Sequence, residues 1–421
     1  MTQPNPPAAP ARAPLKPLDA ALAELLAQAP PLPGVETVST FDADGRVLAQ
    51  DLLSSLDVPA HDNSAMDGYA VRSADWENSA TVLQVNQRIP AGSSGHALAP
   101  LSAARIFTGA PIPPGADAVV MQEDCETLDA GAGETSGVRI RVQAKPGQWI
   151  RRRSEDVASG TAVLHLGDRL TPAALGLAAS IGFDQLQVAP RVRVALFSTG
   201  DELVMPGAVA PLEMKPGAIY NSNRFFLRAL LLRLGCSVTD LGIVPDRLDA
   251  TVAALKNASQ QHDLILTSGG VSVGEEDHIK PAVQALGELK LWQIAIKPGK
   301  PFAYGKIGAA HFIGLPGNPV SSFVTFLLLV RPFILKLQGA TDLAPKSIAL
   351  PAHFDWARAD KRREFLRVKH DGQGGLALFA NQSAGVLTSA VWGDGLVDNP
   401  SGQAIAHGDS VQFIAFSEFL A

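Results

Sequence analysis

Cysteine is scarce in this chain of 421 residues, which contains only Cys125 and Cys236. Two cysteines far apart in the sequence cannot build a disulfide framework, and without CxxC or Cys/His spacing they do not indicate a structural zinc site. We expect packed thiols in a reducing, cytoplasmic compartment. Basic residues are outnumbered as well, and the net charge of -6 argues against a general nucleic-acid binder.

The sequence also lacks a secretory leader, because residues 1–17 are rich in proline and alanine and contain no apolar core. We expect these residues to form a disordered tail. The longest apolar run, 323–330, is interrupted by Thr325 and ended by Arg331 and Pro332. It is too short for a membrane span and typical of a core helix, so we predict no membrane contact.

Motifs for covalent catalysis are missing too. The chain has no Gly-x-Ser-x-Gly elbow, no His-Glu-x-x-His pair and no Walker A lysine motif. Ser268 and Ser272 have no base partner that the sequence reveals. A covalent nucleophile is therefore disfavoured, and chemistry by positioning, metal and charge fits better.

What the chain does have is enough apolar sequence, 46% of its residues, for about two to four domains. Alternating apolar and amphipathic segments over 191–339 predict a mainly parallel sheet with helices on both faces. Short β-like segments predict a β-rich domain over 59–145 and a small antiparallel barrel or sandwich over 340–421. Residues 18–58 and 146–190 are expected to form one discontinuous domain. Predicted strands are 192–197, 236–244, 264–267, 291–296 and 311–315, and predicted helices are 18–28, 171–181, 221–234, 248–259, 278–286 and 320–337.

Glycine-rich or Pro-Gly turns end three apolar runs between residues 263 and 337. They are Ser268-Gly269-Gly270, the Pro298-Gly299 turn flanked by Lys297 and Lys300, and the GLPGNP turn at 314–319. Glycine lets backbone N–H groups approach a phosphate closely, and the carboxyl ends of parallel strands meet at one edge of a sheet. The sequence therefore predicts an anion site at this edge.

Acidic residues follow the same predicted strands, namely Asp201, Glu202, Asp246 and Asp277. Carboxylates beside an anion site indicate a phosphorylated ligand held together with Mg²⁺. Helix capping is the alternative for Asp201 and Asp246, and it stays open.

The stretch PAHDNSAMDGYAV at 59–71 is dense in polar groups. Asp62 and Asp67, with an asparagine and a serine between them, offer oxygen ligands suited to a hard cation. An ordinary exposed loop is the alternative. Residues 151–156, RRRSED, are typical of a solvated surface whose charges pair with one another.

Seven stretches, in order, resemble the MoeA family of molybdopterin molybdenumtransferases, which is related to the gephyrin E domain: HDNSAMDGYAV, RIFTGAPIPPGADAVV, IRRRSED, ALFSTGDEL, TSGGVSVGEEDH, IKPGKPFAYG and GLPGNPVSS. The resemblance covers 18–421 and implies four subdomains. Among them are a central three-layer α/β molybdopterin-binding domain and a C-terminal β-barrel. It also implies a homodimer whose active sites are shared between subunits, with molybdopterin adenylyltransferase and molybdoenzyme maturation proteins as partners.

The implied reaction is the insertion of molybdate into adenylylated molybdopterin, in a Mg²⁺-dependent step that releases AMP. By resemblance, the catalytic residues are Asp62, Asp156, Glu202, Asp246 and Asp277, and the metal ligands are Asp62, Asp67, Glu202, Asp246 and Asp277. The expected ligand-binding residues are Thr108, Ser268, Gly269, Gly270, Lys297, Lys300, Pro316, Pro319, Arg363 and Ser383. Arg367 resembles a residue of the same distal site as Arg363 and Ser383.

The sequence departs from the family pattern in two places. Gln293 stands where many relatives have lysine, so one cation of the predicted anion pocket is missing. Asp398 and Asn399 replace a more usual apolar run. Two further functions stay open, a pterin- or nucleotide-phosphate hydrolase and a carrier or scaffold for the pterin.

Overall fold

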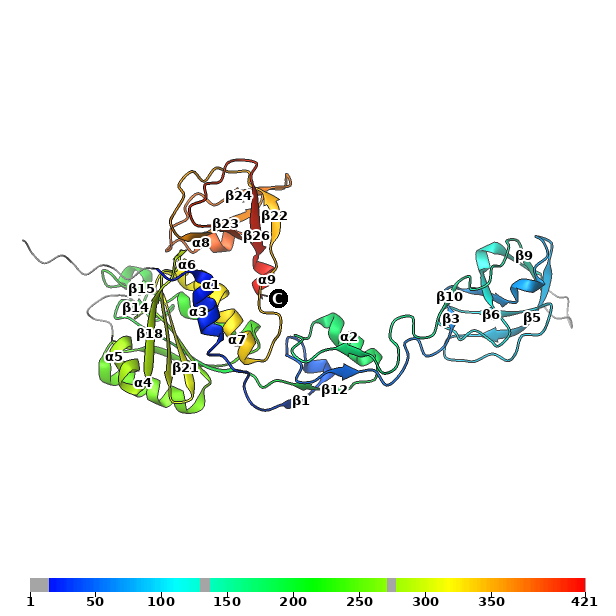
Figure 1. Ribbon diagram of the computed structural model, residues 1–421, viewed down its shortest axis with the longest axis horizontal. Coiled ribbons are helices and arrows are strands. Elements are labelled where there is room, and N and C mark those ends of the chain that lie inside the picture. Colours follow the sequence, from blue (N-terminus) through cyan, green and yellow to red (C-terminus); the bar gives the residue numbers. More distant parts are fainter. Residues whose placement is uncertain (1–14, 129–136, 271–277, 421) are drawn as a thin grey trace, which may run out of the picture.

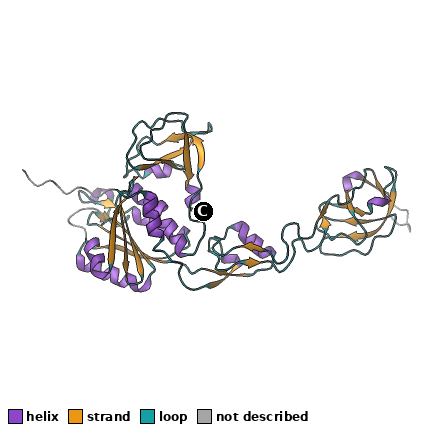
Figure 2. Cartoon of the chain, in the orientation of Figure 1, coloured by secondary structure: helices purple, strands orange, loops and turns teal. Residues whose placement is uncertain are grey.

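The chain is elongated in the computed structural model, which describes residues 15–128, 137–270 and 278–420. At one end lies an α/β body with a smaller β body beside it, a small unit around α2 follows, and a β-rich body forms the far end (Figure 1). Long helices gather in the α/β body, while the far body is mostly strands and loops (Figure 2). The predicted domain limits remain predictions, but the fold is multidomain α/β plus β, as expected.

The α/β body is built on a six-stranded sheet in the order β16-β13-β17-β21-β20-β18. The first four strands pair in parallel, and β20 and β18 pair antiparallel. The strands are β13 (Arg193–Thr199), β16 (Ser237–Val244), β17 (Leu264–Ser268), β18 (Glu288–Gln293), β20 (Pro301–Ile307) and β21 (Ala310–Leu315). The sequence did not predict β20. This strand forms an antiparallel pair with β21 through a short turn, so no crossover helix separates the two strands in the sequence.

Helices cover both faces of this sheet. One face packs against α3 (Asn223–Arg233) and the helix that closes the body, and Leu231 and Phe333 are fully buried there. The other packs against α4 (Leu248–Gln261) and α5 (Ile279–Leu286) through Leu255 and Val283. Two short strands, β14 (Leu203–Val204) and β15 (Ile219–Tyr220), pair in parallel beside the sheet's carboxyl edge.

The closing helix runs as α6 (Pro319–Thr325), a π-helical turn η5 (Phe326–Val330) and α7 (Arg331–Leu337). Proline lacks a backbone N–H, and the π turn lets the helix continue past Pro332. The whole helix of 19 residues is long and apolar enough to cross a membrane, so the length argument from the sequence does not hold. Its most apolar window is 83% buried inside the protein, as in a core helix.

The small unit joins segments from both sides of the β-rich body. β1 (Glu36–Ser39) pairs with β12 (Gln185–Val188), and β2 (Leu52–Leu53) pairs with β11 (Ala162–Leu164). Helix α2 (Pro172–Ser180) packs over them, and Thr171 caps its first turn. Helix α1 (Leu18–Leu26) lies elsewhere, because Ala21 and Leu25 are buried in the α/β core. Within the expected discontinuous domain of 18–58 and 146–190, α1 therefore stands apart, because it packs against α7.

The β-rich body holds a sheet in the order β7-β4-β6-β5-β9-β8. Its strands are β4 (Gly68–Val71), β5 (Val82–Ile89), β6 (Ser102–Ile106), β7 (Ala118–Met121), β8 (Cys125–Leu128) and β9 (Gly137–Ile140). Beside it, β3 (Asn63–Ser64) pairs with β10 (Ile150–Arg151).

The C-terminal β body follows the pairing path β19-β23-β25-β26-β22, and β24 adds to β23. Its elements are β19 (Ile296–Lys297), β22 (Ile348–Pro351), β23 (Arg363–His370), β24 (Leu376–Leu378), β25 (Gly395–Asn399), β26 (Ser410–Ala415), α8 (Thr388–Trp392) and α9 (Phe416–Leu420). Within the described residues the path does not close, so the barrel stays a prediction. β19 comes from the α/β region of the sequence and ties the two bodies together.

Candidate functional site

A cavity of about 560 Å³ opens at the carboxyl edge of the parallel strands. The segments that follow β13, β17 and β21 all contribute to its wall, because parallel strands end at one edge. Of the predicted site residues, the cavity brings together Glu202, Asp246, Ser268, Gly269, Gly270, Pro316 and Pro319. Its size falls within the usual range for small-molecule sites, about 300–1,000 Å³.

Backbone geometry at this edge requires glycine. Gly269 and Gly270 have φ angles of +93° and +66°, a conformation that residues with a Cβ rarely adopt. The Gly269 N–H donates to the Leu315 carbonyl at 3.0 Å, so the loops after β17 and β21 lie against each other. A Cβ on Gly269 would also lie 3.1 Å from the Thr199 carbonyl oxygen.

Two carboxylates lie on the cavity wall. Glu202 is exposed and folds back over Gly200, where an added Cβ would lie 2.6 Å from the Glu202 carboxylate. Asp246 follows β16 and is partly buried. Asp277, the third predicted acid, lies outside the described residues. The lining that the structure describes contains no lysine or arginine.

Sequence reasoning missed two cavity residues, Asn221 and Asn223, at the start of α3. The Asn221 side chain accepts a hydrogen bond from the Arg224 N–H at 3.3 Å, while its buried Nδ2 has no partner within the described part of the chain. Asn223 donates to the Ser268 hydroxyl and to the Gly317 carbonyl, both at 2.7 Å. A signal existed in the run Tyr-Asn-Ser-Asn before the apolar helix, which places amides at a strand-to-helix turn.

The second group of predicted residues lies in the β-rich body. Asp67 accepts hydrogen bonds from the N–H and the hydroxyl of Thr108, each at 2.8 Å, and the backbone donor contributes most to a lowered Asp67 pKa. Asp62 accepts from the Arg153 N–H at 2.8 Å and from the Arg152 guanidinium at 2.7 Å. The backbone bond is again the main cause of its lowered pKa, so both aspartates favour the charged form.

The predicted pairing of charges within 151–156 is wrong for the side chains of Arg152 and Arg153, since the link to Glu155 comes from the Arg152 backbone N–H, at 2.9 Å. Arg152 and Arg153 reach Asp62 and Asp57 instead, across the pairing of β3 with β10. The Ser159 N–H, followed by side-chain hydrogen bonds from Ser154 and Arg153, lowers the pKa of Asp57 to about 2. Asp156 is exposed at the same end, and its N–H donates to the Val58 carbonyl at 3.0 Å.

These two groups lie far apart in one chain. The elements β3 and β4, which carry or adjoin Asp62 and Asp67, are at the opposite end of the molecule from β14 and β15 at the cavity (Figure 1). Across the residues with described positions, no group of three or more His, Cys, Asp or Glu side chains has metal-binding geometry. The four predicted metal ligands whose positions the structure describes are therefore not gathered in a single chain.

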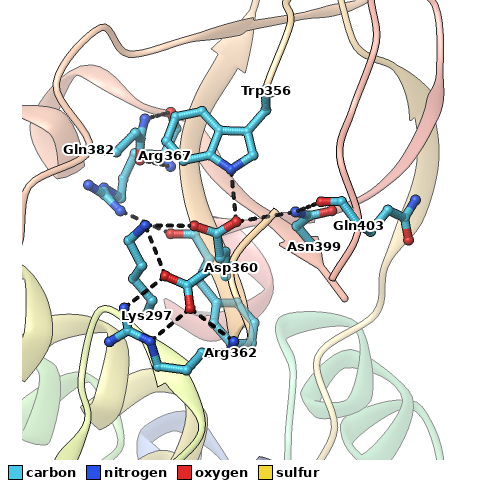
Figure 3. A network of polar contacts seen from close by, with 10 residues as sticks. Lys297, Trp356, Asp360, Arg362, Arg367, Gln382, Asn399 and Gln403 are labelled. Carbon is cyan, nitrogen blue, oxygen red and sulfur yellow. Dashed lines mark hydrogen bonds and ion pairs between the residues drawn. The ribbon is translucent and has the colours of Figure 1, made fainter. Parts of the chain in front are cut away.

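Lys297 lies outside the cavity wall, on the strand β19 that joins the C-terminal sheet. Its Nζ contacts the Glu364 carboxylate at 2.9 Å and Asp360 at 3.4 Å (Figure 3). Glu364, only 1% exposed, also accepts from the Trp356 indole N–H at 2.8 Å. The prediction that Lys297 lies with the glycines and acids at the carboxyl edge of the central sheet is therefore wrong. The role of Lys297 in anion binding stays a prediction.

Lys300 lies closer to the cavity, because it directly precedes Pro301, a lining residue. The turn between the two lysines packs tightly on α6. Gly299 has φ +112°, and a Cβ there would lie 2.3 Å from the Thr325 hydroxyl oxygen. The turn is thus fixed to the helix whose start closes the cavity.

The distal residues belong to the C-terminal body. Arg363 is held by Asp398 through Nε at 2.6 Å and by Asp19 at 3.0 Å, and its pKa is raised mainly by the Asp398 hydrogen bond. The departure at Asp398 therefore supplies a partner for this arginine. Arg367 is 1% exposed and bonds the Ser389 hydroxyl at 3.1 Å, while burial lowers its pKa to about 10.

Ser383 is exposed beside the start of α6. The neighbouring Ala384 carbonyl accepts a hydrogen bond from the Val320 N–H at 2.9 Å. The C-terminal body thus contacts the loop that contributes Pro316 and Pro319 to the cavity wall.

The fold and this cavity define a multidomain α/β plus β protein with a ligand-sized site at the carboxyl edge of a mainly parallel sheet. Three family descriptions match the chain: the MoeA N-terminal region (domain I and II) over 16–182, a probable molybdopterin binding domain over 195–336, and the MoeA C-terminal region (domain IV) over 349–416. The chain belongs to the MoeA family, and the resemblance seen in the sequence is confirmed.

Named relatives support the same assignment. A molybdopterin molybdenumtransferase of Haemophilus influenzae is 42% identical over 366 residues, 85% of this chain and 87% of the relative. Molybdopterin molybdenumtransferase 2 of Mycobacterium tuberculosis is 39% identical over 86% of this chain and 90% of its own length. The crystal structure of a molybdopterin biosynthesis MoeA protein from Pyrococcus horikoshii OT3 aligns with TM-score 0.80 and 27% identity, covering 96% of this chain and 100% of that one. The expected enzyme class, a transferase of molybdenum cofactor biosynthesis, is confirmed.

Proposed function

We propose that the protein inserts molybdate into adenylylated molybdopterin, in a Mg²⁺-dependent step that releases AMP. Support comes from family membership together with the chemistry of the cavity at the edge of the central sheet. The pterin phosphate and the adenylate would lie in this cavity, against the loops after β17 and β21. The protein acts in the cytoplasm in this proposal.

One observation carries the proposal: the cavity combines two carboxylates, Glu202 and Asp246, with backbone amides and neutral side-chain donors. A phosphorylated ligand would be repelled by the carboxylates alone. A divalent cation held by Glu202 and Asp246 would remove that repulsion, because carboxylate and phosphate oxygens are the ligands it prefers. The absence of lysine and arginine from the described lining makes this need stronger.

The donors suit Mg²⁺, which prefers hard oxygen ligands. Glu202 and Asp246 would hold it, with Asp277 as the predicted third acid. When bound, the ion would neutralise phosphate charge. The chain's own contribution is positioning: the Gly269 and Gly270 loop and the Ser268 hydroxyl orient the phosphate, and Pro316 and Pro319 shape the wall.

Lys297 and Lys300 would bind the phosphate or the molybdate side of the ligand, and Arg363 and Ser383 would be residues of the distal site. Lys297 faces two carboxylates, so an oxyanion has to compete with Glu364 and Asp360 for its charge. With Gln293 in place of a lysine, the anion pocket keeps fewer cations. We therefore propose that molybdate binding is the weaker of the two binding events.

A homodimer with shared active sites completes the proposal. Asp62, Asp67, Thr108 and Asp156 would come from the β-rich body of one subunit and face the cavity of the other. Their distance from the cavity within one chain supports this arrangement. Molybdopterin adenylyltransferase would supply the substrate, and molybdoenzyme maturation proteins would receive the product.

The testing experiment measures AMP release from adenylylated molybdopterin with Mg²⁺, in the presence and absence of molybdate. We expect release that depends on molybdate and yields active molybdenum cofactor. Release indifferent to molybdate would instead identify a hydrolase, and tight binding without release a carrier. Omission of Mg²⁺, with EDTA present, serves as the control for the metal.

A further inference from the structure

We infer that Asn223 is a positioning residue that fixes the Ser268 hydroxyl as a hydrogen-bond donor toward the ligand cavity. The identity of the ligand, a nucleoside phosphate, rests on the proposed function. The assignment of Asn223 as donor and Ser268 as acceptor in their hydrogen bond rests on geometry alone.

Asn223 joins three elements at the cavity. It lies in the first turn of α3, and its Nδ2 lies 2.7 Å from the Ser268 hydroxyl oxygen at the end of β17. The same Nδ2 lies 2.7 Å from the Gly317 carbonyl oxygen in the loop after β21. Asn223 is 8% exposed and Ser268 is 4% exposed, so both side chains are held in one arrangement.

The orientation of the Asn223 amide follows from its partners. The oxygen and nitrogen of an amide are told apart by the hydrogen bonds around them. The Gly317 carbonyl can only accept a hydrogen bond, so the amide atom facing it must be the NH₂ group. Since that same atom faces Ser268, it must donate to the hydroxyl oxygen as well.

This arrangement decides what Ser268 can do. A hydroxyl has one hydrogen to donate, and here its oxygen already accepts from Asn223. Within the described residues, the Ser268 hydrogen has no acceptor, and Ser268 lines the cavity. The hydroxyl is therefore positioned to donate its hydrogen to a ligand oxygen. A phosphate oxygen can accept this hydrogen bond, whereas a ligand N–H cannot.

The two glycine loops make the pair sensitive to small shifts. An added Cβ on Gly317 would lie 3.9 Å from the Gly269 Cα, so the loops pass in van der Waals contact beside Asn223. By bonding both loops, Asn223 keeps the Ser268 hydroxyl in one orientation. It acts through this hydroxyl rather than on the reacting atoms.

The test measures AMP affinity in Mg²⁺ by titration calorimetry on the full chain. Asn223→Asp replaces the donor by a carboxylate that only accepts, so the Ser268 hydrogen turns away from the ligand. We expect AMP to bind about ten- to a hundredfold more weakly, the cost of a hydrogen bond to a charged group. Asn223→Ala should cost less, about three- to tenfold, because the Ser268 hydroxyl can then rotate.

Two comparisons separate positioning from simple damage to the fold. Asn223→Ala combined with Ser268→Ala should bind AMP no more weakly than Ser268→Ala alone, since Asn223 acts through that hydroxyl. Asn223→Asp should bind AMP more weakly than Asn223→Ala, because a carboxylate accepts the Ser268 hydrogen whereas alanine leaves that hydrogen free to point at the ligand. Asn257→Asp, at an exposed position of α4, makes the same charge change and should bind AMP as wild type does.

Additive losses in the double variant, or wild-type affinity in Asn223→Asp, would overturn the inference. Wild-type protein that binds no AMP at all would overturn it too. Wild-type protein that binds AMP but forms none from adenylylated molybdopterin on addition of molybdate would refute the proposed function and leave the role of Asn223 standing. Thermal unfolding of each variant confirms that the chain is folded under the titration conditions.

Discussion

Lys297 and Glu364 form an ion pair of 2.9 Å that joins the chain leaving the central sheet to the C-terminal sheet. Glu364 is almost fully buried and is shared with Trp356 and Asn399 (Figure 3). Removing Lys297 or Glu364 alone is expected to destabilise the fold, because it leaves the other charged group without its partner. The contact is therefore one of those that hold the C-terminal body against the α/β body.

Glu364→Ala should lower the free energy of unfolding by about 2–3 kcal/mol, below the cost of breaking a fully buried pair because Lys297 is 37% exposed. Lys297→Met should cost less, since the carboxylate keeps its other donors. The double variant should lose less than the sum of the two single losses. Urea unfolding of the set measures this, with Glu213→Gln, an exposed acid of η4 (Pro211–Glu213), as a neutral control. Strict additivity would show that the pair does not couple the two bodies.

A buried histidine makes the α/β body sensitive to mild acid. His311 on β21 is 7% exposed, shares a hydrogen bond of 3.0 Å with the Tyr304 hydroxyl and packs on Phe333. Burial, with a smaller effect of Lys306, lowers its pKa to about 4. Between pH 6.5 and 4 the unfolded chain binds a proton that the folded chain does not, so stability falls as the pH falls through this window.

In His311→Gln this acid-dependent loss should disappear. The variant should be less stable than wild type at pH 7.5, because the ring packing is lost, and the gap should narrow by up to about 3 kcal/mol by pH 4. Urea midpoints at half-unit pH steps measure the gap. His96→Gln, at an exposed position, serves as the matched control for the substitution itself. A gap between wild type and His311→Gln that stays constant from pH 7.5 to pH 4 would mean that His311 does not titrate as described.

Much of the central sheet could be predicted because its signal is local. Apolar runs followed by glycine turns placed β13, β17 and β21 within one or two residues, and the edge where they end became the cavity. The strand β20 was not predicted, because an antiparallel hairpin strand follows without a helix and so lacks the alternation of strand and helix that marks parallel strands. Helix α1 shows the same limit, since its apolar face fits either of two bodies and only packing selects α7.

The candidate site divides in the same way. That Ser268, Gly269, Gly270, Glu202 and Asp246 lie at one cavity could be predicted from strand ends. The place of Asn223 could not, since it depends on two loops distant in sequence. Lys297 stood beside a glycine turn, like the phosphate-binding loops, but β19 leaves the central sheet for the C-terminal one. Tertiary contacts decide which sheet a two-residue strand such as β19 joins, and the spacing of residues in the sequence does not reveal these contacts.

Shared active sites lead to a prediction that a single-chain site would not satisfy. Asp62 lies in the β-rich body and Glu202 on the cavity wall, at opposite ends of one chain. If the partner's β-rich body completes each cavity, Asp62→Asn and Glu202→Gln homodimers should each lose molybdate-dependent AMP release while keeping the wild-type thermal midpoint. In a mixed dimer one site would carry both changes and the other neither. Equal mixing makes half the dimers mixed, each with one intact site of two, so about a quarter of wild-type activity should return.

The matched control pairs Asp62→Asn with Asp67→Asn. Both changes lie in the β-rich body, so every site of a mixed dimer would contain one of them, and activity should stay absent. Co-expression with two different affinity tags, followed by sequential purification, isolates the mixed dimers of both pairs. The specific activity of the purified mixed dimers should then be about half of wild type for the pair Asp62→Asn and Glu202→Gln, and absent for the control pair. Recovery in both pairs would point to subunit exchange with residual wild-type chain. Recovery in neither pair would place Asp62 and Glu202 in the same site of one chain, against the distance between the elements that adjoin them. Full activity in either homodimeric variant would place that residue outside the site.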